Sequence, residues 1–280
     1  MKHIKFLLVC LLLLFAMPVY AKTMKFVVVS DIHYSPGAIQ SGSRNISNAG
    51  KALNGFINQV NNEKYDFVVF LGDCIDKSRK DDLYSFLGIT KNIKAPYYYT
   101  LGNHDAHKIS GMTQQEYMEI ISLNNPNQKK PDLSYVFYPK PGFAAIVLNN
   151  VPAFAPGSHG YLTQKTLKWL DKTLANNTDK DVLIFQHVPY KPPYIDPTHN
   201  IVNIKEFEEV ISKYDNIKMI ASGHYHKLAV NEDEKGIYHF SAPPLFEEPY
   251  QYSVITVEYN RKPFAKPQNI KFSQKTLNSI

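Results

Sequence analysis

The chain has 280 residues, 44% of them hydrophobic, and a formal net charge of +6 that becomes +4 once Lys2 and Lys5 of the N-terminal segment are removed. The charge is dispersed and forms no long block of lysine and arginine, so a stable nucleic-acid partner is not expected. Cys74 is the one cysteine beyond that segment, which excludes an internal disulfide in the remainder of the chain.

Residues 1–21 have the pattern of a secretory signal peptide. Lys2 and Lys5 form a positive n-region, residues 6–17 form an apolar run, and the letters VYA form a small-x-small cleavage site. The apolar run is about twelve residues long, shorter than the roughly 20 residues that span a bilayer. We therefore expect cleavage, with an uncleaved anchor as the alternative. Residues 22–280 are expected to form a single domain that is exported to the periplasm or the extracellular space and has no membrane contact.

Six short apolar runs predict buried β-strands. Each run is rich in aliphatic or aromatic residues and ends in polar ones, which is typical of strands covered on both faces of a sheet. The runs are residues 25–30, 65–72, 95–102, 143–149, 181–187 and 217–224. The three tyrosines Tyr97 to Tyr99 are therefore expected in the core of a strand and not on a base-stacking surface.

Helical periodicity lies between these runs, at residues 47–62, 163–177 and 203–216. Ser47 and Thr163 are expected N-caps because their hydroxyl groups can accept a hydrogen bond from the first helical turn. Strands that alternate with helices indicate an α/β protein. Residues 227–244 and 251–260 alternate like hairpins instead, so we expect a mixed sheet, or two stacked sheets flanked by helices.

Polar clusters follow five of the predicted strands. They are DIH at 31–33, GDCID at 72–76, GNHD at 102–105, a lone histidine at 187, and GHYH at 223–226. Ligands bind beyond the carboxyl ends of strands in open α/β sheets, so we expect the five clusters to converge. Glycines directly before Asp73, Asn103 and His224 allow tight turns and close backbone approach.

The clusters contain carboxylate, carbonyl and imidazole groups, and this combination suits Mn, Fe, Zn, Co or Ni better than Ca. The candidate ligands are Asp31, His33, Asp73, Asn103, His187, His224 and His226. Cys74 is expected to pack as a small buried hydrophobic residue, and Asp76 to cap the following turn or helix. Four further histidines are expected to be surface or hydrogen-bonded residues without a ligand role, namely His107, His159, His199 and His239.

The five motifs together, in this order over residues 31–226, resemble the calcineurin-like metallophosphoesterase superfamily. The resemblance implies a four-layer αββα sandwich of two mixed β-sheets flanked by helices. It also implies a centre of two divalent or mixed-valence metal ions, with Mn, Fe or Zn expected. GDCID has no tyrosine where purple acid phosphatases have a tyrosine ligand. The chain is therefore more similar to bacterial class III cyclic-nucleotide phosphodiesterases and their relatives.

The resemblance also implies a role for each motif residue. The first metal would be held by Asp31, His33 and His226. The second metal would be held by Asn103, His187 and His224. Asp73 would bridge the two metals, His104 would be the catalytic histidine, and Asp105 would orient His104.

These roles imply an exported, metal-dependent phosphoesterase that hydrolyses a phosphodiester, with a nucleotide as one candidate substrate. A bridging hydroxide would attack phosphorus, and His104 as imidazolium would donate a proton to the leaving group. The expected partner is thus a small phosphoester. A phosphomonoesterase or nucleotidase that releases phosphate is the alternative. A non-catalytic scaffold of the same fold is disfavoured because no motif residue is missing.

Two loops contain candidate substrate contacts. Arg44 and Asn45 lie in the loop after the first motif and would reach a substrate phosphate, although a surface role fits them equally well. Residues 188–200 contain four prolines and read as a stiff loop that borders the site. Within this loop, Tyr190 and Tyr194 are candidate contacts for a base or another leaving group.

The first testable prediction concerns export. If residues 1–21 are a cleaved signal peptide, the exported protein should begin at Lys22. N-terminal sequencing of the exported protein checks this. Recovery of an intact Met1 in a membrane fraction would instead favour an uncleaved anchor.

Overall fold

The computed structural model describes residues 22–106, 111–153, 157–259, 269–278 and 280. The predicted signal peptide and His107 lie outside these residues, so cleavage and the role of His107 stay predictions. Among the described residues, no helix combines the length and the apolar character that crossing a membrane requires.

Two mixed β-sheets form the centre of the molecule. The first has the order β13-β12-β1-β4-β5 and comprises β1 (Lys22–Val29), β4 (Phe67–Phe70), β5 (Tyr97–Tyr99), β12 (Gln251–Tyr259) and β13 (Asn269–Thr276). The second has the order β10-β11-β9-β8-β7-β6 and comprises β6 (Tyr135–Phe137), β7 (Phe143–Val147), β8 (Asp181–Phe185), β9 (Ile217–Ser222), β10 (Ala229–Glu232) and β11 (Tyr238–Ser241).

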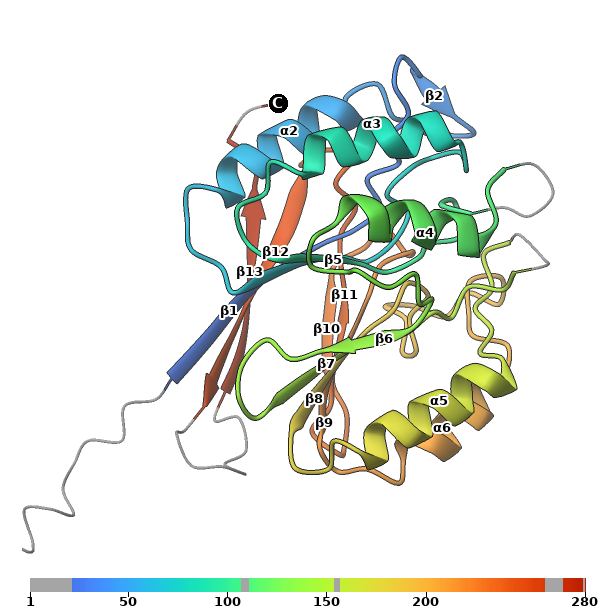
Figure 1. Ribbon diagram of the computed structural model, residues 1–280, viewed down its shortest axis with the longest axis vertical. Coiled ribbons are helices and arrows are strands. Elements are labelled where there is room, and N and C mark those ends of the chain that lie inside the picture. The colour runs from blue at the N-terminus through green and yellow to red at the C-terminus, as the bar shows by residue number, and fades with distance from the viewer. Residues whose placement is uncertain (1–21, 107–110, 154–156, 260–268, 279) are drawn as a thin grey trace, which may run out of the picture.

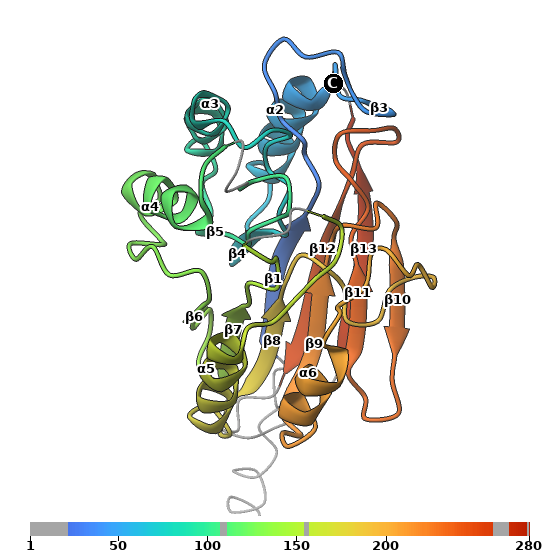
Figure 2. The same ribbon diagram turned by 90° about the vertical axis from the view of Figure 1, so that its right-hand side faces the viewer.

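Helices cover the outer face of each sheet, which gives four layers (Figures 1 and 2). One side has α2 (Ala49–Val60), α3 (Lys80–Thr90) and α4 (Gln114–Asn124). The other side has α5 (Gln164–Ala175) and α6 (Ile204–Ile211). Three layers of apolar side chains hold this stack together: one under each set of helices and one between the two sheets. The predicted αββα sandwich is confirmed.

Aromatic rings join the two sheets. Phe26 of β1 stacks on Phe67 of β4 at 4.5 Å between ring centroids, and the ring of Phe185 from β8 meets Phe26 edge to face at 5.9 Å. All three side chains are buried. Because interior side chains pack at crystal-like density, these contacts fix the position of one sheet relative to the other.

The parallel strands set the direction in which the site faces. In the first sheet β1, β4 and β5 run parallel to one another, and in the second sheet β7, β8 and β9 do so. The loops after β1, β4, β5, β8 and β9 are those that contain the five polar motifs. Each sheet therefore delivers part of the motif set from the carboxyl ends of neighbouring strands.

Most of the predicted elements are present, with some differences. Thr163 caps α5 by accepting a hydrogen bond from the backbone N–H of Thr166. The cap predicted at Ser47 is wrong, because α2 begins after Asn48, whose side chain makes no capping hydrogen bond. Tyr97 and Tyr99 are buried in β5, as expected. The helices α3 and α4 were not expected from periodicity, and a short hairpin of β2 (Gln40–Ser41) and β3 (Arg44–Asn45) follows the first motif.

Candidate metal centre and active site

The candidate metal ligands converge into neighbouring clusters at the strand ends. Potential ligand atoms lie within 4.8 Å of one another in each of three groups: Asp31, His33 and His226; His33, Asp73 and His104; and Asp73, His187 and His224. Asp73 belongs to two of these groups and so connects the side chains of the first sheet with those of the second. The convergence expected from the strand order is thus present.

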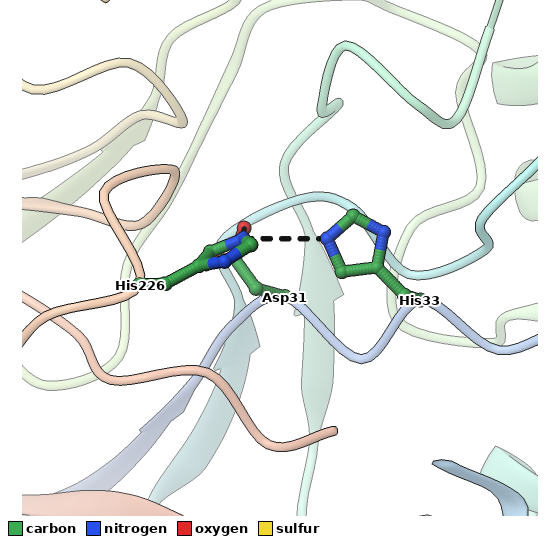
Figure 3. A group of neighbouring side chains, drawn as sticks. All are labelled: Asp31, His33 and His226. Atoms are coloured by element: carbon green, nitrogen blue, oxygen red, sulfur yellow. Dashed lines mark hydrogen bonds and ion pairs between the residues drawn. The ribbon is translucent and has the colours of Figure 1, made fainter. Parts of the chain in front are cut away.

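The first cluster joins residues from opposite sheets (Figure 3). Oδ1 of Asp31 lies 3.3 Å from Nε2 of His226, and Nε2 of His33 also lies 3.3 Å from that nitrogen. Asp31 and His33 follow β1, whereas His226 follows β9 of the other sheet. The relative position of the sheets therefore decides whether this cluster exists.

The second cluster forms around Nε2 of His187. This nitrogen lies 2.9 Å from Oδ1 of Asn103 and 3.4 Å from Oδ2 of Asp73. The same Asp73 oxygen lies 3.7 Å from Nε2 of His33 in the first cluster. One carboxylate oxygen of Asp73 thus faces an imidazole of each cluster.

Groups behind the clusters fix which imidazole nitrogen faces inward. Nδ1 of His187 lies 2.7 Å from the carbonyl oxygen of Leu71, and Nε2 of His224 lies 2.7 Å from that of Ser158. A carbonyl only accepts, so each of these nitrogens bears the proton and the other nitrogen keeps its lone pair for the cluster. Partners of this kind are what orient histidine ligands in metal sites.

Several hydrogen-bond acceptor atoms therefore face one another, and this arrangement shows whether the residues fit a metal ion. In neutral His187 the unprotonated Nε2 faces both the Asn103 carbonyl and the Asp73 carboxylate, and in the imidazolium a proton on Nε2 takes the position that a metal would occupy. Acceptors without a donor between them repel, and buried charges require pairing or a metal ion. A cation removes both problems at once. The residues present accordingly fit a metal centre.

The pKa shifts agree with a negatively charged pair of carboxylates. Burial would raise the pKa of Asp31, but the His226 imidazole outweighs burial and lowers it to about 2. In Asp73, too, burial is opposed by the His187 imidazole, and the pKa falls well below its usual range. Burial would lower the pKa of His187, yet Asp73 raises it to about 9. A metal therefore has to displace a proton from His187 at neutral pH, so metal binding should strengthen as pH rises.

Backbone strain is concentrated at the clusters. Asp31, His33, Asp73, His224 and His226 are five of the six described non-glycine residues with positive φ, at 46° to 70°. Such left-handed conformations persist only where the surrounding structure enforces them, and they gather at functional sites. Gly102 contributes in another way, because a Cβ there would fall on the backbone of Asp73.

His104 lies beside the first cluster. Its ring meets that of His33 edge to face at 4.7 Å, and its backbone N–H donates to Oδ1 of Asp73 at 2.8 Å. Nδ1 of His104 lies 2.9 Å from the backbone carbonyl oxygen of Asp76. That carbonyl accepts, so Nδ1 bears a proton, and Nε2 is the nitrogen left to act on a substrate.

The structure gives Asp105 a different contact from the expected one. Its two carboxylate oxygens accept hydrogen bonds from the backbone N–H groups of Ile75 at 3.0 Å and Gly102 at 2.8 Å. The carboxylate thereby ties the second motif to the third. The group that faces Nδ1 of His104 is the carbonyl of Asp76, so the expected orienting contact from Asp105 is corrected.

Asp76 is a site residue that the sequence interpretation missed. It was expected to be a helix cap, but the residue at the N-cap of α3 is Arg79. The carboxylate of Asp76 is fully buried, and its Oδ1 lies 3.2 Å from Nδ1 of His33 and 3.2 Å from a guanidinium nitrogen of Arg44. The second acidic residue of GDCID, three positions after Asp73, was the available signal.

Arg44 reaches the site, whereas Asn45 and Tyr190 do not. Arg44 extends from β3, and its second guanidinium nitrogen lies 3.4 Å from Nε2 of His104. Asn45 instead accepts hydrogen bonds from the backbone and hydroxyl of Ser47 on an exposed turn. Tyr190 packs its ring on Phe207 and donates its hydroxyl to a glutamate of α6. These contacts place neither side chain in the clusters, and a substrate contact by Asn45 or Tyr190 stays a prediction.

The remaining histidines and Cys74 have other surroundings. His159 lies 3.1 Å from the side-chain oxygen of Asn200, and His239 is buried 2.9 Å from a carboxylate oxygen of Asp233. Cys74 is buried and free, and burial raises the pKa of its thiol well above the usual range. These residues match expectation. His199 matches it as well, since its side chain is 39% exposed and its Nδ1 lies 2.9 Å from a carboxylate oxygen of Asp196, and its ring also lies 5.1 Å from that of His224.

Comparisons with known proteins point in one direction. The model of the family described as "Calcineurin-like phosphoesterase" matches residues 24–228. The chain is 28% identical over 237 residues, 79% of its length and 78% of the relative, to an Arcobacter nitrofigilis protein named "Probable glycerophosphodiester phosphodiesterase". It is 29% identical to a Haemophilus influenzae 3',5'-cyclic adenosine monophosphate phosphodiesterase, over 67% of this chain and 63% of that protein.

A solved structure supports the fold. The crystal structure of a dimetal phosphatase from Danio rerio superimposes with a TM-score of 0.69 over 91% of this chain and 99% of that one, at 16% sequence identity. Together with the family match over residues 24–228, this agreement identifies the chain as a phosphoric ester hydrolase that belongs to the calcineurin-like phosphoesterase family.

Proposed function

We propose that the protein hydrolyses a phosphodiester at a centre of two metal ions. The observation that carries the proposal is the position of Asp73, one oxygen of which lies 3.7 Å from Nε2 of His33 and 3.4 Å from Nε2 of His187. A carboxylate between two sets of imidazoles is the arrangement that a bridging ligand requires. Two-metal sites of this type are used for in-line displacement at phosphorus.

The two ligand sets follow the clusters. Asp31, His33 and His226 would hold one ion, Asn103, His187 and His224 the other, and Asp73 both. Imidazole with carboxylate suits Mn, Fe or Zn. Bound there, the ions would supply positive charge that lowers the pKa of a water molecule and neutralises phosphoryl oxygens.

The protein side chains would manage the leaving group and the substrate charge. The Asp76 carbonyl holds Nδ1 of His104, so Nε2 would donate the proton that a poor alkoxide leaving group needs. Arg44 lies 3.4 Å from that nitrogen, where its guanidinium would bind a phosphoryl oxygen. Its other contact, to the buried Asp76 carboxylate, would hold the guanidinium in place.

The substrate class follows from the same groups. A small phosphodiester fits the proposal because His104 supplies a proton for an ester leaving group, and the two relatives above are named for diesters. A phosphomonoesterase is the second candidate, because the positive charge of Arg44 would also favour a doubly charged terminal phosphate. Export remains part of the proposal and rests on the sequence of residues 1–21.

The next prediction concerns metal binding. The protein from Lys22 onward, incubated with Mn, Fe or Zn, should bind about two ions per chain, as a two-metal site requires. Asp73→Ala should lose both metal and activity because one carboxylate serves both ions. Elemental analysis and rate assays check this. Asp233→Ala is the matched control, since Asp233 also contacts a histidine, His239, but outside the clusters. Wild-type metal content in Asp73→Ala would contradict the bridging role.

A further prediction tests phosphodiester hydrolysis together with the role of His104. A panel of an alkyl phosphodiester, a nucleoside phosphodiester, bis-nitrophenyl phosphate and an alkyl phosphomonoester should show faster turnover of the diesters. His104→Ala should slow hydrolysis of the alkyl diester by about 10²-fold or more, because loss of a general acid costs about 10²–10⁴-fold. The rate on bis-nitrophenyl phosphate should fall much less, since the nitrophenolate leaving group needs little protonation.

The metal content of His104→Ala decides between alternatives. His104 forms a possible ligand group with His33 and Asp73, so loss of metal would make it a ligand and not an acid. Retained metal with equal losses on both leaving groups would indicate charge stabilisation instead. Turnover of the monoester alone would favour the phosphomonoesterase candidate.

Arg44 gives a separate prediction. Arg44→Ala should lower kcat/KM by about 10- to 100-fold, because hydrogen bonds to charged groups contribute about 1.5–3 kcal/mol. The loss should appear mainly in KM, with the metal content unchanged. Arg79→Ala is the matched control, since Arg79 also pairs with an aspartate, Asp82, but is not in the clusters. If Arg44→Ala loses metal as well, Arg44 acts through Asp76 and His33 and not on the substrate.

A further inference from the structure

A row of aromatic rings extends from the second cluster to the surface. The ring of His199 lies 5.1 Å from that of His224, Tyr225 lies 5.9 Å from His199, and Tyr194 lies 5.0 Å from Tyr225. The proline-rich loop after β8 supplies Tyr194 and His199, and the turn after β9 supplies the other two rings. The row therefore begins at a candidate metal ligand.

Two rings of the row, those of Tyr194 and His199, are accessible and held in place. Tyr194 is 48% exposed, and the His199 side chain is 39% exposed. Tyr225 is buried beneath them and meets their rings at steep angles of 69° and 68°. His199 is further fixed by Asp196, whose carboxylate lies 2.9 Å from Nδ1. Rings that are already ordered lose little entropy when another ring stacks on them.

The row also lies on a defined side of the centre. His104 and Arg44 lie beside the first cluster, whereas His199 contacts His224 of the second. Asp73 is the residue that both sides share. A phosphoryl group placed at Asp73 with its leaving group at His104 would direct its other substituent toward His199.

We propose that Tyr194 and His199 form a stacking surface for a planar aromatic substituent of the substrate, such as a nucleobase. This substituent is on the ester group that is retained after hydrolysis. The proposal rests on the proposed phosphodiesterase function and adds the chemical class of the retained group. It accounts for two exposed rings beside a polar centre, since the faces of aromatic rings bind planar groups through stacking.

A binding experiment tests the stacking surface without turnover. Phenyl phosphate and methyl phosphate share the phosphate group and differ in the ring, and both resemble a product with a retained substituent. Calorimetric titration of the Mn-loaded protein should give tighter binding of phenyl phosphate. Tyr194→Ala should weaken the affinity for phenyl phosphate by about 5- to 100-fold, the range that stacking contributes per ring. The affinity for methyl phosphate should stay unchanged.

Three further variants separate stacking from structural effects. Tyr194→Phe keeps the ring and should retain the affinity for phenyl phosphate. His199→Ala should weaken the affinity for phenyl phosphate but not for methyl phosphate, and should keep the metal content. Tyr138→Ala is the matched control, because Tyr138 is 58% exposed and has a lysine amino group 5.8 Å over its ring, as Tyr194 has at 5.6 Å. It should bind both ligands as the wild type does.

The outcomes are distinguishable. Equal effects of Tyr194→Ala on both ligands, or no effect on either, would overturn the stacking surface. Loss of metal in His199→Ala would overturn the part of the proposal that concerns His199, since it would show that His199 only supports His224. If the wild type binds phenyl phosphate selectively but hydrolyses no diester, the proposed function fails while the stacking surface stands.

Discussion

The site depends on the placement of one buried carboxylate between two groups of imidazoles. Asp73 comes from the first sheet, and it faces His33 of the same sheet and His187 of the other. A shift of one sheet by an ångström or so would separate these atoms or force them into repulsion. The inter-sheet packing of Phe26, Phe67 and Phe185 therefore supports the chemistry as well as the stability of the fold.

The sandwich also enforces an unfavourable backbone. Five candidate ligands have left-handed backbone conformations, each of which costs on the order of 1–3 kcal/mol in a non-glycine residue. The strands before them, β1, β4 and β9, end in buried residues, Val29, Phe70 and Ser222. With these conformations Asp31 and His33, two residues apart, both reach the first cluster. The glycines of the motifs let the neighbouring turns approach closely enough for that to happen.

Local patterns in the sequence were sufficient to predict the strands that precede the motifs and the residues that converge, whereas β6 and β13 were not predicted and the four layers were implied by the family resemblance. The local patterns were also insufficient for α3, which has weak periodicity. In α4 a signal was present, the capping box of Thr113 and Glu116. The orienting groups were harder to predict because three of them are backbone carbonyls, those of Leu71, Asp76 and Ser158, and only the tertiary fold brings these to a histidine. Tyr190 and Tyr194 likewise share a loop, and only packing decides which ring is buried.

The protein groups around the centre differ between its two sides, and this difference matters for selectivity. Metal ions attract any phosphate, so they cannot by themselves distinguish one ester substituent from the other. Next to the first cluster, His104 and Arg44 offer a proton and a positive charge. Next to the second, His199, Tyr225 and Tyr194 offer aromatic rings. Under the proposed function, in which His104 is the proton donor, a diester would therefore have a preferred orientation with the leaving oxygen at His104, because the opposite orientation would place the donor beside the bond that stays intact.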